Sequence, residues 1–405
     1  MSLSRKPGLT ALLARDPAAV RWRAAGAWND LAAEAVHYGL APLVHRRLQD
    51  AGASPPCDVV RILRDRYLAS AAANMRLFHE LAAILRAMDG AGIPAIPLKG
   101  ASLAAIVYGD IALRPMGDID ILVRPADMQA AVGTLRGLGY GSAYAFDPAS
   151  EESISHHMPP MSADGRAPVE LHWTLVHPRA AARIGRSEIE DAWSRAVPAA
   201  IDGVPARMLA PEDQLLHLCM HASVHHQFGV GLRAFVDIAE ACRRFEQELD
   251  WTQVTRRANR WGVANGVRMA LTLAQEWTEL AVPASVQAGL NGAQADEDSL
   301  DWARHKVLDG GPAALKSDFA RLETETSAVG RLMLLRDAFF PSRAVMARRY
   351  GVPGDSRRIL FFYPHRLWDL WGRYRGALWK LLTRDKTLVA EIHHEARLRA
   401  YLGAN

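Results

Sequence analysis

Two aspartates, Asp118 and Asp120, lie in a stretch that alternates acidic and aliphatic side chains, Asp-Ile-Asp-Ile-Leu-Val. Such alternation predicts a β-strand, and on a strand residues i and i+2 project from the same face. Two carboxylates about 6 to 7 Å apart along one face can both reach a divalent cation. Mg²⁺, or Mn²⁺ in its place, suits such a pair because it also accepts waters and polyphosphate oxygens as ligands.

A second same-face pair, Glu170 and His172, lies on the alternating stretch Val-Glu-Leu-His-Trp-Thr. Glu170 could supply a third carboxylate to the metal site. With two metal ions, three such acids hold an in-line displacement and activate an acceptor hydroxyl. The alternative is that both residues are simply the polar positions of a half-exposed strand, and this alternative is stronger for His172.

The segment Lys99, Gly100, Ala101 and Ser102 lies where a short apolar strand is expected to give way to a helix. A glycine there lets backbone N–H groups approach an anion, and a helix N-terminus attracts phosphate. Lys99 is one of only six lysines among 48 basic residues, and it could place a compact charge on a phosphate. Arg114, four residues before Asp118, could bind another phosphate oxygen bidentately.

Three histidines, His217, His221 and His225, recur every four residues and would share one face of a helix. Such spacing can form a metal triad. We favour ordinary interhelical histidines, because the metalloprotease pattern His-Glu-x-x-His is absent. The neighbouring pair His156 and His157 falls in an expected loop that could cover the site.

The elements that must position these residues divide the chain into three regions. Residues 1–90 and 211–405 read as helical, and Pro211 with two following acids is a typical helix start. Residues 91–210 interleave strands with helices, which predicts an α/β or α+β unit. We expect strands over 93–98, 118–123 and 169–174 and helices over 100–108 and 127–138. The strand over 93–98 contains proline and should lie near a sheet edge.

Composition excludes several classes of protein. With 405 residues, 50% of them hydrophobic and 23% charged, the chain should form two or three globular units. The three cysteines form no Cys-x-x-Cys pair, which argues against a disulfide framework and a thiolate zinc site. We find neither a leader sequence nor an apolar run of about 18 residues. A cytoplasmic location and no membrane span are therefore expected.

The net charge of +4 conceals a basic C-terminal region. Residues 331–405 carry 15 basic and 6 acidic side chains, a net of +9, which leaves −5 for the rest. Trp368, Trp371 and Trp379 lie among its basic residues. Such a helix can bind nucleic acid, an anionic membrane or an acidic peptide. We favour the plainer interpretation, in which the tryptophan face packs on the protein.

Taken together, the segments Ile-Pro-Leu-Lys-Gly-Ala-Ser-Leu, Leu-Arg-Pro-Met-Gly-Asp-Ile-Asp-Ile-Leu-Val and Val-Glu-Leu-His-Trp resemble a bacterial family of uncharacterised nucleotidyltransferases. That family lies within the DNA polymerase β-like superfamily. The resemblance covers about 65–260 and includes the helical segments that contain His221, Arg233 and Asp237. The family implies an α+β fold in which a small mixed sheet with helices, the polymerase β-like core, is flanked by N- and C-terminal helical regions.

The resemblance also implies a site. Asp118 and Asp120 match the metal-binding pair, and Glu170 matches the third acid. The superfamily's usual Gly-Ser phosphate turn is replaced here by Lys99 and Gly100, a form typical of this subfamily. His221, Arg233 and Asp237, with His172, are expected to line the nucleotide or acceptor pocket. Family members resemble accessory proteins of peptide natural-product biosynthesis, so a peptide or small metabolite is the expected acceptor.

The predicted reaction is magnesium-dependent transfer of a nucleoside monophosphate from an NTP, expected to be ATP, to a hydroxyl of a small molecule, peptide or protein. Three alternatives remain open. The same site could act as a kinase that transfers the γ-phosphoryl group. It could bind nucleotide without turnover while the chain recruits a partner. It could also be a toxin-type transferase that modifies RNA, although nucleic acid is the less favoured partner.

Overall fold

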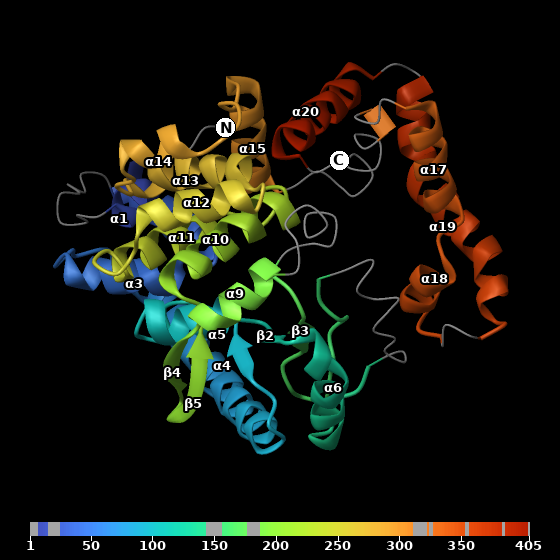
Figure 1. The fold of residues 1–405 in the computed structure, drawn as a ribbon. Coiled ribbons are helices and arrows are strands. Elements are labelled where there is room, and N and C mark those ends of the chain that lie inside the picture. Colours follow the sequence, from blue (N-terminus) through green and yellow to red (C-terminus); the bar gives the residue numbers. More distant parts are fainter. Residues whose placement is uncertain are drawn as a thin grey trace.

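The computed structural model describes residues 7–14, 25–142, 156–175, 187–310, 322–323, 327–352, 356–382 and 385–403. Within these ranges the chain combines many helices with two small sheets (Figure 1), so the predicted α+β class is confirmed. No helix in the described part is both long and apolar enough to cross a membrane. All three cysteines are free.

Helices dominate the described residues before position 91, as predicted. They are α1 (Pro7–Leu13), α2 (Ala25–His37), α3 (Ala41–Asp50) and α4 (Cys57–Gly90). The long helix α4 buries an apolar stripe that includes Leu77, Leu81 and Leu85. These residues recur every four positions and therefore share one face. α4 ends at Gly90, where the sequence predicted a helix stop.

The central sheet has three strands, β1 (Ala95–Pro97), β2 (Ile119–Val123) and β3 (Val169–His172). Their order is β1-β2-β3, with β1 antiparallel and β3 parallel to β2. Pro97 thus lies on an edge strand, as predicted, where its missing N–H costs no ladder hydrogen bond. The register pairs Asp120 with Glu170, which sets the geometry of the candidate site. Each predicted strand was longer than the observed one: β2 begins after Asp118, β1 covers only Ala95–Pro97, and β3 ends at His172.

The connections place helices around this sheet. They are α5 (Lys99–Ser102), the π-helix η3 (Leu103–Val107), the 3-10 turn η4 (Pro125–Asp127), α6 (Met128–Gly137) and α9 (Ser187–Arg195). The backbone of 156–161 runs beside β3: Met158 N–H donates to Leu171 O and Val169 N–H donates to Met161 O. This pairing covers the second edge of the sheet and brings two histidines to it.

A hairpin that the sequence analysis missed follows α9. It consists of β4 (Val197–Ile201) and β5 (Val204–Met208), paired antiparallel with Ile201 opposite Val204. The two-residue turn is Asp202-Gly203, and both residues have positive φ, 49° and 71°. Asp-Gly is the sequence signal for such a turn, since hairpin turns of this type need two left-handed residues.

The remaining helices lie C-terminal to the hairpin. They are α10 (Pro211–Met220), the π-helix η5 (His221–His225), α11 (Arg233–Arg244), α12 (Trp251–Arg260), α13 (Ala264–Thr278), α14 (Ala284–Gly289), α15 (Glu297–Asp309), α17 (Ala328–Phe339), α18 (Arg343–Tyr350), α19 (Ile359–Leu382) and α20 (Lys386–Leu402). α10 begins with Pro211 and two acids in its first turn, as predicted.

Two hydrophobic cores hold the described chain together. The larger core joins α1–α3 to α10–α15, so the N-terminal helices share their interior with the C-terminal ones. The second core fills the space between the sheet, α4 and α6. The predicted domain boundaries at residues 90 and 210 stay a prediction. The larger core joins the first and third predicted regions.

The favoured interpretation of the basic C-terminal region is wrong. Trp368, Trp371 and Trp379 are 75%, 60% and 69% exposed. The reason is that α19 uses its other face for packing: Ile359 is fully buried in a small cluster with α18, and Leu370 is 7% exposed. Figure 1 shows α17, α18 and α19 standing apart from the rest of the chain.

Candidate active site

Neighbouring parallel strands bring two acids and a histidine together. Asp120 lies on β2 opposite Glu170 on β3, and His172 follows two residues later on the same strand. One ligand atom from each of these three residues lies within 4.8 Å of the others. Among the described residues, these three form the candidate metal-binding group. The structure therefore brings two of the three predicted acids together, along with the predicted His172.

Asp120 is the most tightly held member of the group, with only 3% of its surface exposed. Its Oδ1 accepts a hydrogen bond from Lys99 Nζ at 2.8 Å. His172 Nε2 lies 2.7 Å from the same oxygen and donates to it in the tautomer protonated there. Burial opposes ionisation, but the His172 hydrogen bond and the Lys99 charge outweigh it and hold the pKa of Asp120 below its usual range. Asp120 is therefore a carboxylate.

Glu170 is electrostatically the opposite case. Burial, followed by the charge of Asp120, raises the pKa of Glu170 to about 7. Its Oε2 lies 3.7 Å from His157 Nδ1 and 3.8 Å from His172 Nε2. The raised pKa means that a second negative charge is unfavourable beside Asp120 without more positive charge nearby. A divalent cation would supply that charge, so these donors fit the predicted metal.

Asp118 is placed differently. It lies immediately before β2 and is exposed, and it is not part of the compact group formed by Asp120, Glu170 and His172. Partial removal from water and the charge of Asp120 raise the pKa of Asp118. Its predicted part in metal binding stays a prediction.

The predicted phosphate turn adopts an unusual backbone conformation. Lys99 has a φ of 44°, in the left-handed region that L-residues other than glycine rarely adopt. Its ammonium group contacts Asp120, as described above. A Cβ at Gly100 would lie 2.8 Å from Arg114 Nη1 and 3.0 Å from the Met116 side chain. Glycine is therefore required here by the close approach of Arg114.

Ala101 and Ser102 turn inward. Ala101 and Ser102 are each 1% exposed. Ser102 Oγ lies 3.5 Å from Gln214 Oε1 on α10. Ala101 packs in the core around the sheet and Ser102 contacts α10, so contact with a ligand would fall to the backbone.

Arg114 is bound to an acid from the helical region. Its Nη2 and Nε donate to Asp237 Oδ2 at 3.0 and 3.3 Å, and its Nη1 donates to Pro115 O at 3.2 Å. Tyr108 donates to Asp237 Oδ1 at 2.8 Å. Asp237 is buried and Arg114 is half-buried, with side-chain exposures of 3% and 14%. Two predicted site residues are thus joined, and α11 is tied to the loop before β2.

Arg233, which was predicted to line the nucleotide or acceptor pocket with His221 and Asp237, begins α11. A Cβ at Gly39 would lie 2.9 Å from Arg233 Nη1, so the arginine reaches the end of α2. Burial, followed by the charge of Arg114, lowers the pKa of Arg233. Its predicted contact with nucleotide stays a prediction.

A cluster of histidine rings adjoins the acids, more extensive than the sequence analysis expected. His156 lies between His157 and His225, with ring centroids 4.5 and 4.4 Å away; it meets His157 edge-on and His225 at a tilt. His157 lies 5.0 Å from His172. The ring of His221, on the same π-helix η5, lies 6.3 Å from that of His225 between centroids. The His156-His157 pair and the four-residue spacing on α10 and η5 were the only sequence signals for this cluster.

Removal from water favours the neutral form of three histidines on α10 and η5. Burial lowers the pKa of His217 to about 3 and lowers the pKa values of His221 and His225 well below the usual range. Among the described residues, His217, His221 and His225 are not grouped closely enough to be a candidate metal site, and their role as ordinary interhelical histidines stays a prediction.

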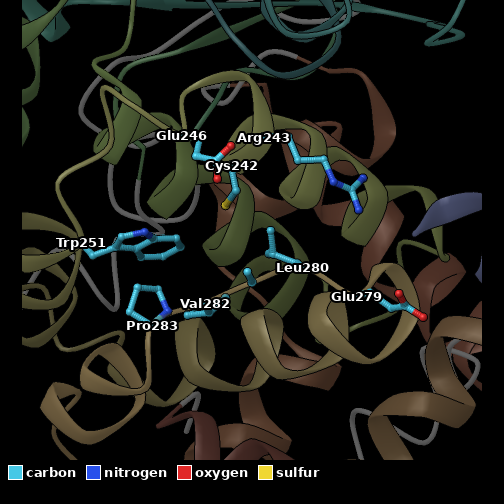
Figure 2. Close-up of a pocket in the computed structure, with 9 residues that line it drawn as sticks. Cys242, Arg243, Glu246, Trp251, Glu279, Leu280, Val282 and Pro283 are labelled. Carbon is cyan, nitrogen blue, oxygen red and sulfur yellow. The ribbon is translucent and has the colours of Figure 1, made fainter. Parts of the chain in front are cut away.

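A separate pocket of about 330 Å³ lies in the helical region (Figure 2). It is lined by the end of α11, the start of α12 and the segment 279–283, including Cys242, Trp251 and Pro283. None of its lining residues belongs to the predicted site, so it offers no support for the predicted nucleotide-binding residues.

The family model for uncharacterised nucleotidyltransferases matches residues 24–279. The matched range includes the three strands of the central sheet, the turn at Lys99, and His221 of η5 with Arg233 and Asp237 of α11. The chain therefore belongs to this nucleotidyltransferase family, which confirms the predicted family. No curated protein and no solved structure matched the chain.

Proposed function

We propose that the chain is a magnesium-dependent nucleotidyltransferase that moves a nucleoside monophosphate from an NTP, with ATP as the expected donor, to an acceptor hydroxyl. The observation that carries the proposal is the grouping of Asp120 and Glu170 beside Lys99 in a chain of this family. The sheet would then be the polymerase β-like core, with regions 1–90 and 211–405 as helical flanks.

In this proposal Asp118, Asp120 and Glu170 hold the metal, with Asp118 turning toward the other two from its exposed position. Bound Mg²⁺ would neutralise charge on the donor phosphates and orient them. Glu170 would also help to take the proton from the acceptor hydroxyl. His172 keeps Asp120 oriented through its hydrogen bond.

The positive groups of the site would act on the donor phosphates. Lys99 would exchange its contact with Asp120 for the β- and γ-phosphates, and the backbone of Gly100, Ala101 and Ser102 would face them. Catalysis of this kind consists mainly of positioning and charge neutralisation. His221, Arg233 and Asp237 would line the pocket, Asp237 by fixing Arg114. A peptide or small-metabolite acceptor and a cytoplasmic location complete the proposal.

The test uses ATP labelled at the α- or γ-phosphate with a panel of hydroxyl-bearing peptides and metabolites. Label from the α-phosphate should appear on the product, and Asp118→Ala, Asp120→Asn and Glu170→Gln should each reduce transfer by at least about a hundredfold. Asp164→Asn, in an exposed turn before β3, is the matched control and should retain activity. Transfer of γ-label would instead make the chain a kinase, and full turnover by the Asp120 variant would refute the site.

Calorimetry with Mg²⁺ and a non-hydrolysable ATP analogue tests binding before any acceptor is known. The wild-type protein should bind the analogue, and Asp120→Asn should weaken that binding. Binding without labelling of any acceptor in the panel would favour the non-catalytic alternative. Co-purifying RNA whose binding falls steeply with salt would favour the RNA-directed alternative.

A further inference from the structure

Helices α17 and α19 expose apolar side chains that a folded chain usually buries. Of the sixteen large hydrophobic residues that are exposed in the described part of the chain, thirteen lie between 329 and 389. α17 has no buried residue at all, although Leu332, Met333 and Phe339 lie on it. Exposed apolar surface concentrated in one region marks an interaction site.

The exposed aromatic residues of α19 lie on one side of the helix. Phe361, Trp368, Trp371 and Trp379 are separated by seven, three and eight positions, which places them within about 80° around a helix of 3.6 residues per turn. Their exposures run from 60% to 80%. Ile359 and Leu370, which are buried, lie on the opposite side of the helix.

The same segment is strongly basic. Residues 328–384 contain 12 lysines and arginines and only 3 acidic residues. Arg357 and Arg358 are exposed at the start of α19, and Arg375 is exposed on the helix beside the tryptophans. We call the exposed side chains of α17 and α19, with these arginines, the aromatic-basic surface.

Charge and chemistry together select the partner. A second copy of the chain would bring two positive surfaces together, which like-charge repulsion opposes. Nucleic acid would stack on tryptophan but would not cover the leucine and methionine of α17. An anionic bilayer meets both needs, because tryptophan rings lie at the headgroup level, aliphatic side chains enter the acyl boundary and arginines meet anionic headgroups.

We propose that the aromatic-basic surface docks the protein on an anionic lipid surface. Both signals required for stable peripheral attachment, apolar side chains and a basic patch, lie on the same two helices. The inference is independent of the reaction at Asp120 and Glu170, because none of the residues that carry it belongs to that site.

The experiment is co-sedimentation of the full chain with vesicles of phosphatidylcholine alone or with about 30% phosphatidylglycerol. We expect binding to the anionic vesicles, a blue shift of tryptophan fluorescence, and weaker binding at high salt. The triple variant Trp368→Ala/Trp371→Ala/Trp379→Ala should bind at least about tenfold more weakly. Leu68→Ala/Met75→Ala, which removes exposed apolar side chains from α4, is the control and should bind like wild type.

Equal binding to both vesicle types, or unchanged binding by the triple variant with a native circular dichroism spectrum, would overturn the proposal. The proposal would also be overturned if the wild-type protein formed a dimer or bound RNA, lost that interaction in the triple variant, and did not bind vesicles. Charge-reversal variants Arg357→Glu/Arg358→Glu supply a second measurement that leaves the tryptophans in place, and they should also weaken vesicle binding.

Discussion

At the scale of single residues, the buried charge of Asp120 is the main electrostatic feature of the candidate site. It is nearly inaccessible to water, yet it stays ionised because Lys99 and His172 both contact its Oδ1. Burial, followed by the charge of Asp120, raises the pKa of the neighbouring Glu170. The Lys99 ammonium therefore supplies positive charge beside these two acids.

Replacing this lysine should separate metal binding from nucleotide binding. Lys99→Met removes an ammonium that competes with a cation for Asp120, so Mn²⁺ should bind the nucleotide-free protein about tenfold more tightly, which corresponds to about 1.4 kcal/mol. Affinity for the metal complex of ATP should fall if Lys99 contacts phosphate. Mn²⁺ binding is read by electron paramagnetic resonance, with Lys386→Met at the exposed start of α20 as control. Unchanged Mn²⁺ affinity in Lys99→Met would show that the ammonium does not compete.

At the scale of elements, the sequence predicted what local pattern determines. Alternation located β2 and β3, and proline placed β1 at an edge. The parallel register that sets Asp120 opposite Glu170 is a contact between residues fifty positions apart, which no local pattern encodes. The salt bridge between Arg114 and Asp237 and the histidine cluster also join residues far apart in the sequence, so no local pattern could predict them. The hairpin was missed although its Asp-Gly turn was readable, because its strands are rich in alanine and proline, which are poor strand formers.

The hairpin turn gives an element-scale prediction with a matched control. Gly203 has a φ of 71°, and a Cβ there would meet no atom within 4 Å. Gly203→Ala should therefore cost about 1 kcal/mol of unfolding free energy from backbone strain alone. Gly133 lies exposed inside α6, also with free space for a Cβ, and Gly133→Ala should stabilise by about 0.5 to 1 kcal/mol. Chemical denaturation checks both, and a shift of the same sign in both variants would contradict the argument.

At the scale of the whole molecule, helix α20 connects the aromatic-basic surface to the main body (Figure 1). Its attachment rests on a buried ion pair with α15: Lys306 Nζ lies 2.8 and 3.0 Å from the Glu395 carboxylate oxygens. Trp302 Nε1 donates to Glu395 at 2.9 Å. The side chains of Lys306 and Glu395 are 3% and 0% exposed. An outer pair, Arg397 with two aspartates, is far more accessible to water.

The two pairs should therefore differ sharply in their effect on stability. Glu395→Ala leaves the Lys306 ammonium buried without its carboxylate and should cost about 3 to 5 kcal/mol, whereas Arg397→Ala at the exposed pair should cost at most about 1 kcal/mol. Replacing both partners, Lys306→Met/Glu395→Met, should recover part of the loss because no buried ammonium remains. Thermal unfolding gives the ranking, and hydrogen exchange should show α20 losing protection before α13. If Glu395→Ala left that protection intact, α20 would be held by its apolar contacts. The buried ion pair would then not be what attaches the aromatic-basic surface to the main body.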